Sequence, residues 1–279
     1  MERTVLWSAT LGPRPLVERV EAAAANGYSV LSLGSNDEGE AAASTGRSAG
    51  ELRRWASDLG VELSILDGIS EWYPHHPPKR SFGSAAFSAD DVLRMGTAFG
   101  VDSVGAIAPF PSDASVEELA EHFAVLCDLA ADRGIRIQLE FTPFPAVPDL
   151  TTAWEIVRLA DRPNGGILLD TWHFFRGNPD FEVLATVPGK RIMAVQISDG
   201  GPELQESLIK DTFRHRLLPG DGSFDLTRVL RTLDATGGLN LVGPEVLSDE
   251  LFELPANEAA RVCAESFDRL AAELAVQAG

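Results

Sequence analysis

One pattern recurs along the chain: an Ala/Leu-rich stretch with helical spacing, a glycine, and then a short run of aliphatic and β-branched residues. It occurs in the segments AAAANGYSVLSL, ASDLGVELSIL, TAFGVDSVGAI, AADRGIRIQLE and DATGGLNLVGPE. A glycine after a helix supplies the left-handed residue of a C-terminal cap. The apolar run that follows is typical of a parallel strand buried on both faces. The pattern therefore predicts helices that alternate with buried strands.

Two further apolar runs, GGILLD and KRIMAVQIS, and the opening segment TVLWSAT bring the predicted strands to eight. Eight strand–helix units within about 250 residues predict a (β/α)8 TIM barrel, an α/β fold. A doubly wound open sheet is the alternative, but it is usually shorter, and no glycine-rich phosphate-binding sequence follows the first strand. The predicted strands are Thr4–Ala9, Tyr28–Gly34, Val61–Gly68, Ser103–Ala108, Ile135–Phe141, Gly166–Asp170, Arg191–Ile197 and Leu239–Leu247.

Helices are predicted between these strands. The stretches Ser88–Gly100 and Ser115–Gly134 each begin with a serine that can cap a helix, followed by acidic residues in the first turn. The last helix is predicted over Ala256–Val276. No low-complexity linker divides the 279 residues, so one domain over residues 1–279 is expected.

Polar side chains end four of the predicted strands. They are Glu140 in IRIQLEF, Asp170 in ILLD, Gln196 in MAVQ and Glu245 in LVGPE. Side chains alternate between the two faces of a strand, and the outward face of a barrel packs on helices. In IRIQLE the isoleucines and the leucine share one face, so Glu140 is predicted to point inward. The same alternation turns the other three ends toward the barrel axis.

Three buried carboxylates close together repel one another unless some are protonated or a cation lies among them. A divalent cation is therefore the predicted cofactor. The all-oxygen ligand set of Glu140, Asp170, Gln196 and Glu245 favours Mn²⁺ or Mg²⁺, with Co²⁺ or Zn²⁺ as alternatives. The competing interpretation makes each acid a local cap or ion-pair partner, but four such ends on consecutive strands favour the metal.

A metal in this place would bind a substrate carbonyl oxygen and a neighbouring hydroxyl, and would stabilise the enediolate left by proton abstraction. Glu140 and Glu245 are the candidate acid/base residues, one removing and the other returning a proton. Loss of a β-hydroxyl instead would give dehydration. His173 follows Asp170 by three residues and is the third candidate catalytic residue, which would also bind a substrate oxygen. Its competing interpretation is a loop histidine bonded to a backbone carbonyl.

Two long connections, over residues 69–87 and 200–224, follow strands and so belong to the face where barrel active sites form. The second carries Lys210 and Arg216 as candidate ligands of a substrate carboxylate or phosphate, within a basic group completed by Arg214 and His215. Surface ion pairs are the competing interpretation. In the first connection, Trp72 is the candidate substrate-binding residue, forming with Tyr73 a wall over a sugar-like ring. His75 and His76 are interpreted as exposed.

These features resemble the sugar phosphate isomerase/epimerase superfamily, the xylose isomerase-like TIM barrels, over nearly the whole chain. The family's metal ligands are Glu on strand five, Asp on strand six, usually His on strand seven, and Glu on strand eight. The corresponding residues here are Glu140, Asp170, Gln196 and Glu245. The family's Asp-x-x-His sequence on strand six is matched by DTWH, ending at His173, and its basic residue before a Pro-Gly turn by Arg216.

Gln196 is similar to the ligand of the 3-dehydroshikimate dehydratases of the same superfamily. Those enzymes follow their strand-five Glu with a His-Pro pair, whereas Phe141, Thr142 and Pro143 follow it here. The leading prediction is a metal-dependent isomerase or epimerase of carbohydrate metabolism, acting on a small keto-sugar or keto-polyol. The alternative is a dehydratase, a lyase acting on a keto-hydroxy acid such as 3-dehydroshikimate.

Two other functions compete with these predictions. One is a barrel that binds a carbohydrate-like ligand without converting it. The other is an apurinic-site endonuclease, which needs a histidine-rich site of several metals and a basic face. It fits poorly, because this chain has five histidines and a formal charge of −19.

The negative charge also predicts no nucleic-acid partner and no anionic membrane surface. Cys127 and Cys263 lie in helical patterns and are predicted to be free, buried thiols, which favours a reducing cytoplasm. Neither a secretory signal nor a membrane-spanning apolar run is recognised in the sequence. The expected partner is a small polyol, keto-sugar or keto-acid, and self-association into a homo-oligomer is left open.

Overall fold

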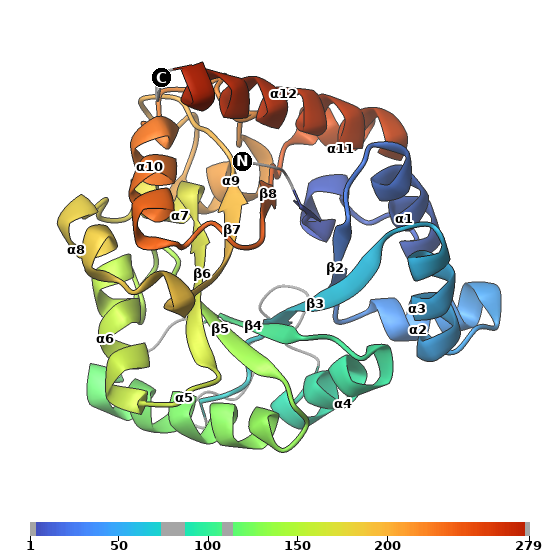
Figure 1. The fold of residues 1–279 in the computed structure, drawn as a ribbon, viewed down its shortest axis with the longest axis horizontal. Coiled ribbons are helices and arrows are strands. Elements are labelled where there is room, and N and C mark those ends of the chain that lie inside the picture. The colour runs from blue at the N-terminus through green and yellow to red at the C-terminus, as the bar shows by residue number, and fades with distance from the viewer. Residues whose placement is uncertain (1–3, 74–86, 108–113, 277–279) are drawn as a thin grey trace.

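Eight parallel strands pair in chain order from β1 to β8 and form a barrel surrounded by helices (Figure 1). The computed structural model describes residues 4–73, 87–107 and 114–276. The strands are β1 (Val5–Leu6), β2 (Val30–Gly34), β3 (Glu62–Ile69), β4 (Ser103–Ile107), β5 (Arg136–Glu140), β6 (Gly165–Asp170), β7 (Ile192–Ile197) and β8 (Val242–Pro244). The predicted TIM barrel is therefore confirmed.

The first and last strands close the barrel through Thr4 and Val242. The backbone N–H of Thr4 donates to the carbonyl of Val242 at 2.8 Å, and the N–H of Val242 donates to the Thr4 hydroxyl at 2.9 Å. Gly243 allows this approach, because a Cβ atom there would lie 1.8 Å from the carbonyl oxygen of Val5. The small residue at 243 is thus a condition of closure.

All eight predicted strands are found, but the first and last are shorter than predicted. After β1 the chain turns into a 3₁₀ helix over Ser8–Leu11, which ends at Gly12 with φ 65°. β8 ends at Pro244, which has no N–H to continue the ladder. Glu245 follows it, and its N–H donates to the carbonyl of Ile197 at 2.9 Å. The position of Glu245 is therefore still fixed against β7.

The helices form the outer layer of the barrel (Figure 1). The predicted caps are confirmed: Ser88 and Ser115 each accept a hydrogen bond from the backbone three residues on, in reciprocal capping boxes. The helices are α1 (Leu16–Ala25), α2 (Asp37–Thr45), α3 (Ala49–Asp58), α4 (Ala89–Phe99), α5 (Val116–Ala131), α6 (Leu150–Ala160), α7 (Thr171–Arg176), α8 (Phe181–Thr186), α9 (Leu208–Arg214), α10 (Leu226–Thr236), α11 (Asp249–Glu253) and α12 (Ala256–Val276).

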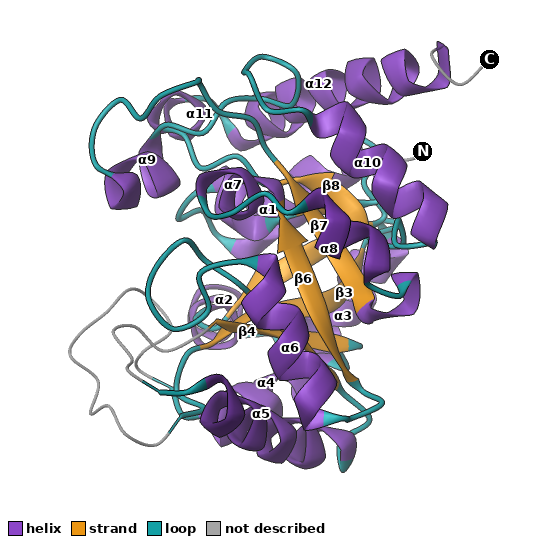
Figure 2. Cartoon of the chain, turned by 90° about the vertical axis from the view of Figure 1, so that its left-hand side faces the viewer, coloured by secondary structure: helices purple, strands orange, loops and turns teal. Residues whose placement is uncertain are grey.

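The connection over residues 200–224, predicted as a loop, contains the helix α9. Its two ends are tied together by the buried Asp199, whose carboxylate accepts hydrogen bonds from the N–H groups of Gly200, Gly220 and Phe224. Figure 2 shows α7 beside the arrowhead of β6 and α9 farther out on the same side of the barrel. Both helices therefore lie on the face that the carboxyl ends of the strands define.

Apolar residues fill both sides of the barrel wall. The inner cluster consists of Val5, Trp7, Val30, Ile65, Leu168 and Ala194. The larger cluster joins the strands to the surrounding helices and includes Cys127 and Cys263, which are free and buried as predicted. Burial raises the pKa of each thiol to about 12, so neither is a reactive thiolate at neutral pH. Within the described residues, no helix is both long and apolar enough to cross a membrane.

Candidate functional site

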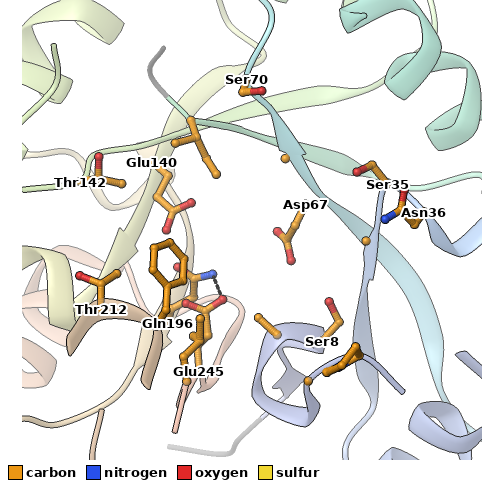
Figure 3. Close-up of a pocket in the computed structure, with 18 of the residues that line it drawn as sticks. Ser8, Ser35, Asn36, Asp67, Ser70, Glu140, Thr142, Gln196, Thr212 and Glu245 are labelled. Carbon is orange, nitrogen blue, oxygen red and sulfur yellow. Dashed lines mark hydrogen bonds between the residues drawn. The ribbon is translucent and has the colours of Figure 1, made fainter. Parts of the chain in front are cut away.

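A cavity of about 510 Å³ opens at the carboxyl ends of the strands. Figure 3 shows Glu140, Gln196 and Glu245 on one side of it and Asp67 on another, with open space between them. Its other polar lining residues include His173, Arg216, Ser8, Ser35 and Asn36. Substrate sites of TIM barrels lie at this end of the fold. The cavity is therefore the candidate functional site.

The four predicted strand ends all lie in this region and are buried. Glu140 ends β5, Asp170 ends β6, Gln196 lies on β7, and Glu245 directly follows β8. Leu168 and Ala194 belong to the cluster inside the barrel, and Asp170 and Gln196 follow them by two residues. The alternation of side chains along a strand therefore turns both polar side chains inward, as predicted.

Glu140, Asp170 and His173 form a group of side chains that could hold a metal ion. One ligand atom from each lies within 4.8 Å of the others. His173 lies on the first turn of α7, and its Nε2 is 3.3 Å from Oδ2 of Asp170 and 3.5 Å from Oε1 of Glu140. α7 begins directly after β6, which is why a histidine three residues beyond Asp170 returns over the strand end.

Arg216 contacts two of the carboxyl groups at the strand ends, those of Asp170 and Glu245. Its Nη1 donates to Oδ2 of Asp170 at 2.8 Å and to Oε2 of Glu245 at 3.2 Å, while its Nε donates to the carbonyl of Thr212 at 2.8 Å. Burial alone would lower the pKa of Arg216, but the charges of Asp170 and Glu245 raise it above its ordinary value. The guanidinium therefore stays protonated and gives the site one fixed positive charge.

The pKa values of the two carboxyl groups that share Arg216 move in opposite directions. Burial favours the neutral form of Asp170, but the charges of Arg216 and His173, with hydrogen bonds from Arg216 and Trp172, hold its pKa below the ordinary value. Burial raises the pKa of Glu245 well above its ordinary value, and Asp170 and Glu140 add to that shift against the opposing charge of Arg216. Two neighbouring carboxyl groups thus differ in proton affinity.

Gln196 has one satisfied and one unsatisfied polar atom. Its Nε2 donates to Oε1 of Glu245 at 2.8 Å (Figure 3). Its Oε1 is buried and has no hydrogen-bond partner among the described residues. An amide oxygen without a partner in a buried polar site is available to a ligand or a cation.

Asp67 is a functional candidate that the sequence predictions missed. It lies on β3 and follows Ile65, a member of the inner cluster, by two residues, so it points into the barrel. Its Oδ2 accepts a hydrogen bond from the Ser32 hydroxyl at 2.8 Å, and the Ser32 oxygen accepts one from the N–H of Ser8 at 2.9 Å. Burial raises the pKa of Asp67 to about 7. The signal was present in the sequence, because ILDG carries an acid near the end of an apolar strand, two residues before β3 ends at Ile69.

The remaining predicted residues lie elsewhere. Trp72 is 7% exposed, donates from its indole N–H to the carbonyl of Ile107 at 2.8 Å, and packs edge-on against Phe123. Ile107 lines the cavity, but Trp72 itself is not among the lining residues. Lys210 is on the exposed side of α9, paired with Glu206 at 2.5 Å. His75 and His76 lie outside the described residues.

An eight-stranded parallel barrel with acidic strand ends defines a class of proteins that bind small ligands at the carboxyl face. Residues 20–271 match the family described as xylose isomerase-like TIM barrel, and the chain belongs to that family.

Two relatives of this chain are named as different kinds of enzyme, a dehydratase and an isomerase. The chain is 28% identical over 256 residues to a 3-dehydroshikimate dehydratase of Pseudomonas aeruginosa, covering 89% of this chain and 38% of the relative. It is 33% identical over 147 residues to an inosose isomerase of Bacillus subtilis, covering 52% of this chain and 50% of the relative. The chain thus spans half or less of the length of these two relatives.

Solved structures show the same fold. A crystal structure of the IOLI protein with a bound zinc atom superposes with a TM-score of 0.84, covering 98% of this chain and 99% of that chain. The two sequences are 22% identical, so the likeness establishes the fold alone.

Proposed function

We propose that Glu140, Asp170, Gln196 and Glu245 bind one divalent cation. The charges of the described residues support this. Asp170 and Glu245 share one guanidinium, that of Arg216, and Glu140 lies close to Asp170, so two negative charges remain without compensation when all three are ionised. Buried charges need an opposite charge close by, and one divalent cation supplies the missing two.

The side-chain atoms also fit a metal. The buried Oε1 of Gln196 has no partner within the described part of the chain, and a metal would satisfy it. Asp170 and Glu245 accept hydrogen bonds from side-chain and backbone N–H groups, and each accepting oxygen takes only one such bond. Each of these oxygens therefore keeps a free lone pair. Because oxygen ligands dominate, Mn²⁺ and Mg²⁺ fit best, with Zn²⁺ or Co²⁺ as alternatives if His173 joins the site.

The proposed reaction is the isomerisation or epimerisation of a small keto-sugar or keto-polyol. A bound divalent cation would act as a Lewis acid toward a substrate carbonyl. Glu140 and Glu245 reach the cavity from different strands, so one can remove a proton beside that carbonyl while the other returns a proton from another side. His173 lines the same cavity and would hydrogen-bond a substrate oxygen.

One observation carries this proposal: the buried polar ends of four consecutive strands lie close together, three of them line the cavity, and the fourth, Asp170, pairs with Arg216, which lines it too. The similarity to the inosose isomerase of Bacillus subtilis supports the reaction class, since that name describes an isomerase of a keto-inositol. Arg216, predicted to bind substrate, would first hold Asp170 and Glu245 in place, because its Nη1 already donates to both.

Dehydration of a keto-hydroxy acid is the second candidate. The similarity to the dehydratase of Pseudomonas aeruginosa extends over 89% of this chain, and a glutamine ligand resembles that group of enzymes. The same groups serve both reactions, because each begins with removal of a proton beside a carbonyl. The reactions part only when a β-hydroxyl leaves.

Metal content and isotope exchange test the proposal. Purified protein stripped with a chelator and reloaded is expected to bind one Mn²⁺ tightly, and Glu245→Gln is expected to lose most of that affinity. Incubation of the loaded protein with inososes and ketohexoses in D₂O should place deuterium beside the carbonyl. Aromatic absorbance growing from 3-dehydroshikimate would instead identify the dehydratase. A protein that binds no divalent metal under any loading condition would exclude both.

A further inference from the structure

The cavity has a second polar wall, opposite the proposed metal ligands, which we call the Asp67 wall. It consists of Asp67 and the two residues that hold it, Ser32 and Ser8. The N–H of Ser8 donates to the Ser32 oxygen, and the Ser32 hydroxyl donates onward to Oδ2 of Asp67. Because Ser32 is fully buried, this series of hydrogen bonds fixes the Asp67 carboxyl group in one orientation. In Figure 3 Asp67 projects into the open space that Glu140 and Glu245 face from the other side.

The second oxygen of Asp67 is the one presented to a ligand. Ser32 holds Oδ2, and Oδ1 lies beside Gly105 of β4, where an added Cβ atom would be 3.5 Å from it. Among the described residues no hydrogen bond to Oδ1 is found, so this oxygen is open to a ligand. A carboxylate is a pure acceptor, and a substrate hydroxyl is the donor that suits it.

Arg14 and Arg19 also line the cavity, but they offer the Asp67 wall no free positive charge. Arg14 donates to the carbonyls of Leu11, Phe252 and Leu254. Arg19 pairs with Asp37, which is itself buried. Both arginines are therefore already paired with carbonyl or carboxylate groups of the protein. A phosphate or carboxylate placed here would be repelled by the Asp67 carboxylate, because neither of these arginines is free to compensate the two negative charges. A neutral hydroxyl group would not be repelled.

We propose that the Asp67 wall is a hydroxyl-binding subsite, and that it selects an uncharged polyhydroxy ketone over an anionic keto acid. The inference rests on the proposed function, because the metal ligands would hold the carbonyl end of the ligand. A hydroxyl group at the far end of the same molecule donates to Oδ1 of Asp67. The subsite thereby favours a keto-inositol or ketose, free of phosphate and carboxylate, as the substrate.

The protonation of Asp67 agrees with this role. Burial brings its pKa to about 7, with the nearby charges of Glu140 and Asp37 adding to the shift and Ser32 opposing it. A divalent cation in the cavity would lower that pKa by favouring the ionised form. At pH 8 the group is therefore an acceptor for hydroxyls.

Calorimetric titration of the Mn²⁺-loaded protein at pH 8 tests the subsite with two probes, an inosose and 3-dehydroshikimate. Replacing a charged acceptor weakens a hydrogen bond, so Asp67→Asn is expected to raise the Kd of the inosose by about tenfold or more. The same substitution removes a negative charge facing the anionic probe, so its Kd is expected to stay the same or fall. Ser32→Ala, which frees Asp67 to rotate, should weaken inosose binding to a smaller extent.

Glu40→Gln is the matched control, because Glu40 is an exposed carboxylate that lines the same cavity without contacting the Asp67 wall in the described structure. It removes the same charge and is expected to leave the Kd of the inosose unchanged. Equal effects of Asp67→Asn and Glu40→Gln, or no effect of Asp67→Asn, would overturn the subsite while Mn²⁺ binding stands. No binding of the inosose by the Mn²⁺-loaded wild-type protein would overturn it too. If the wild-type protein does not bind Mn²⁺, the metal proposal itself is overturned, and the subsite proposal that rests on it is overturned too.

Discussion

Arg216 and Asp170 form a buried ion pair, with 2.8 Å between Nη1 and Oδ2 and side chains that are 2% and 0% exposed, and Arg216 also lines the cavity. The same Nη1 is 3.2 Å from Oε2 of Glu245. One guanidinium thus holds two carboxyl groups that project from the ends of β6 and β8, the two strands that flank β7. Removing it would leave both acids buried without their shared cation, and such losses are far more costly than the loss of a surface pair.

Arg216→Gln is therefore expected to lower the free energy of unfolding of the metal-free protein by about 3 kcal/mol or more. Urea unfolding in the presence of a chelator measures this loss. Saturating Mn²⁺ should restore part of it, because a divalent cation compensates the same carboxylates and binds only the folded state.

Arg214→Gln is the control for this experiment. Arg214 pairs with Asp249 at 2.7 Å, but both side chains are about half exposed, at 51% and 47%. Exposed pairs contribute only about 0–1 kcal/mol, so this variant is expected to unfold almost like the wild type. Equal losses in the two variants, or a Mn²⁺ response in the Arg214 variant alone, would contradict the role given to Arg216.

Gln196→His is expected to change which metal the protein prefers. An imidazole nitrogen suits Zn²⁺ better than an amide oxygen does, so the Zn²⁺/Mg²⁺ affinity ratio should rise by about tenfold or more. The substitution also removes the hydrogen bond from Nε2 to Glu245, which the histidine ring can replace only with its remaining N–H. Competition titrations with a chromophoric chelator measure the ratio. An unchanged ratio would show that residue 196 does not touch the metal.

The barrel and its acidic strand ends could be predicted because their signals are local. Glycine caps, buried apolar runs and the alternation of side chains need no knowledge of distant contacts, and they correctly placed Glu140 and Asp170 at the ends of β5 and β6. The same alternation applied to ILDG would have found Asp67. A pattern of polar strand ends does not select it, because Gly68 and Ile69 continue β3 beyond Asp67.

Other features of the site depend on contacts that no local pattern contains. Trp72 was expected at the cavity, but its indole N–H finds the carbonyl of Ile107 on the neighbouring strand and its ring packs in the core. Lys210 was expected to meet an anionic substrate, yet it pairs with Glu206, which lies just before α9. The packing of the whole chain determines such hydrogen-bond and ion-pair partners. The type of a residue therefore does not by itself predict whether it lies at the cavity.

His173→Asn is expected to slow isotope exchange by about 10²-fold, the lower range for the loss of a proton-transfer group, while Mn²⁺ affinity changes little. The expectation follows from the position of Nε2, 3.3 Å from Asp170 and 3.5 Å from Glu140 at the edge of the cavity. His122→Asn on α5 is the control, because that ring stacks edge-on with Tyr73 instead. A large loss of Mn²⁺ affinity in the His173 variant would make His173 a metal ligand.

Asp67→Asn is expected to stabilise the metal-free protein at pH 8, and the reason is the direction of its pKa shift. Burial raises the pKa of Asp67 from 3.8 to about 7, so the unfolded chain releases this proton at a lower pH than the folded chain does. The wild type therefore loses stability as the pH rises from about 4 to about 7, and the loss stays constant above that range. Asparagine cannot ionise and still accepts the bond from Ser32, so the variant should gain about 2–4 kcal/mol at pH 8. The difference should vanish near pH 4, as measured by urea unfolding across that range. A variant less stable than the wild type at pH 8, or a difference that does not depend on pH, would contradict the assignment of Asp67 as a strained, ligand-facing acid.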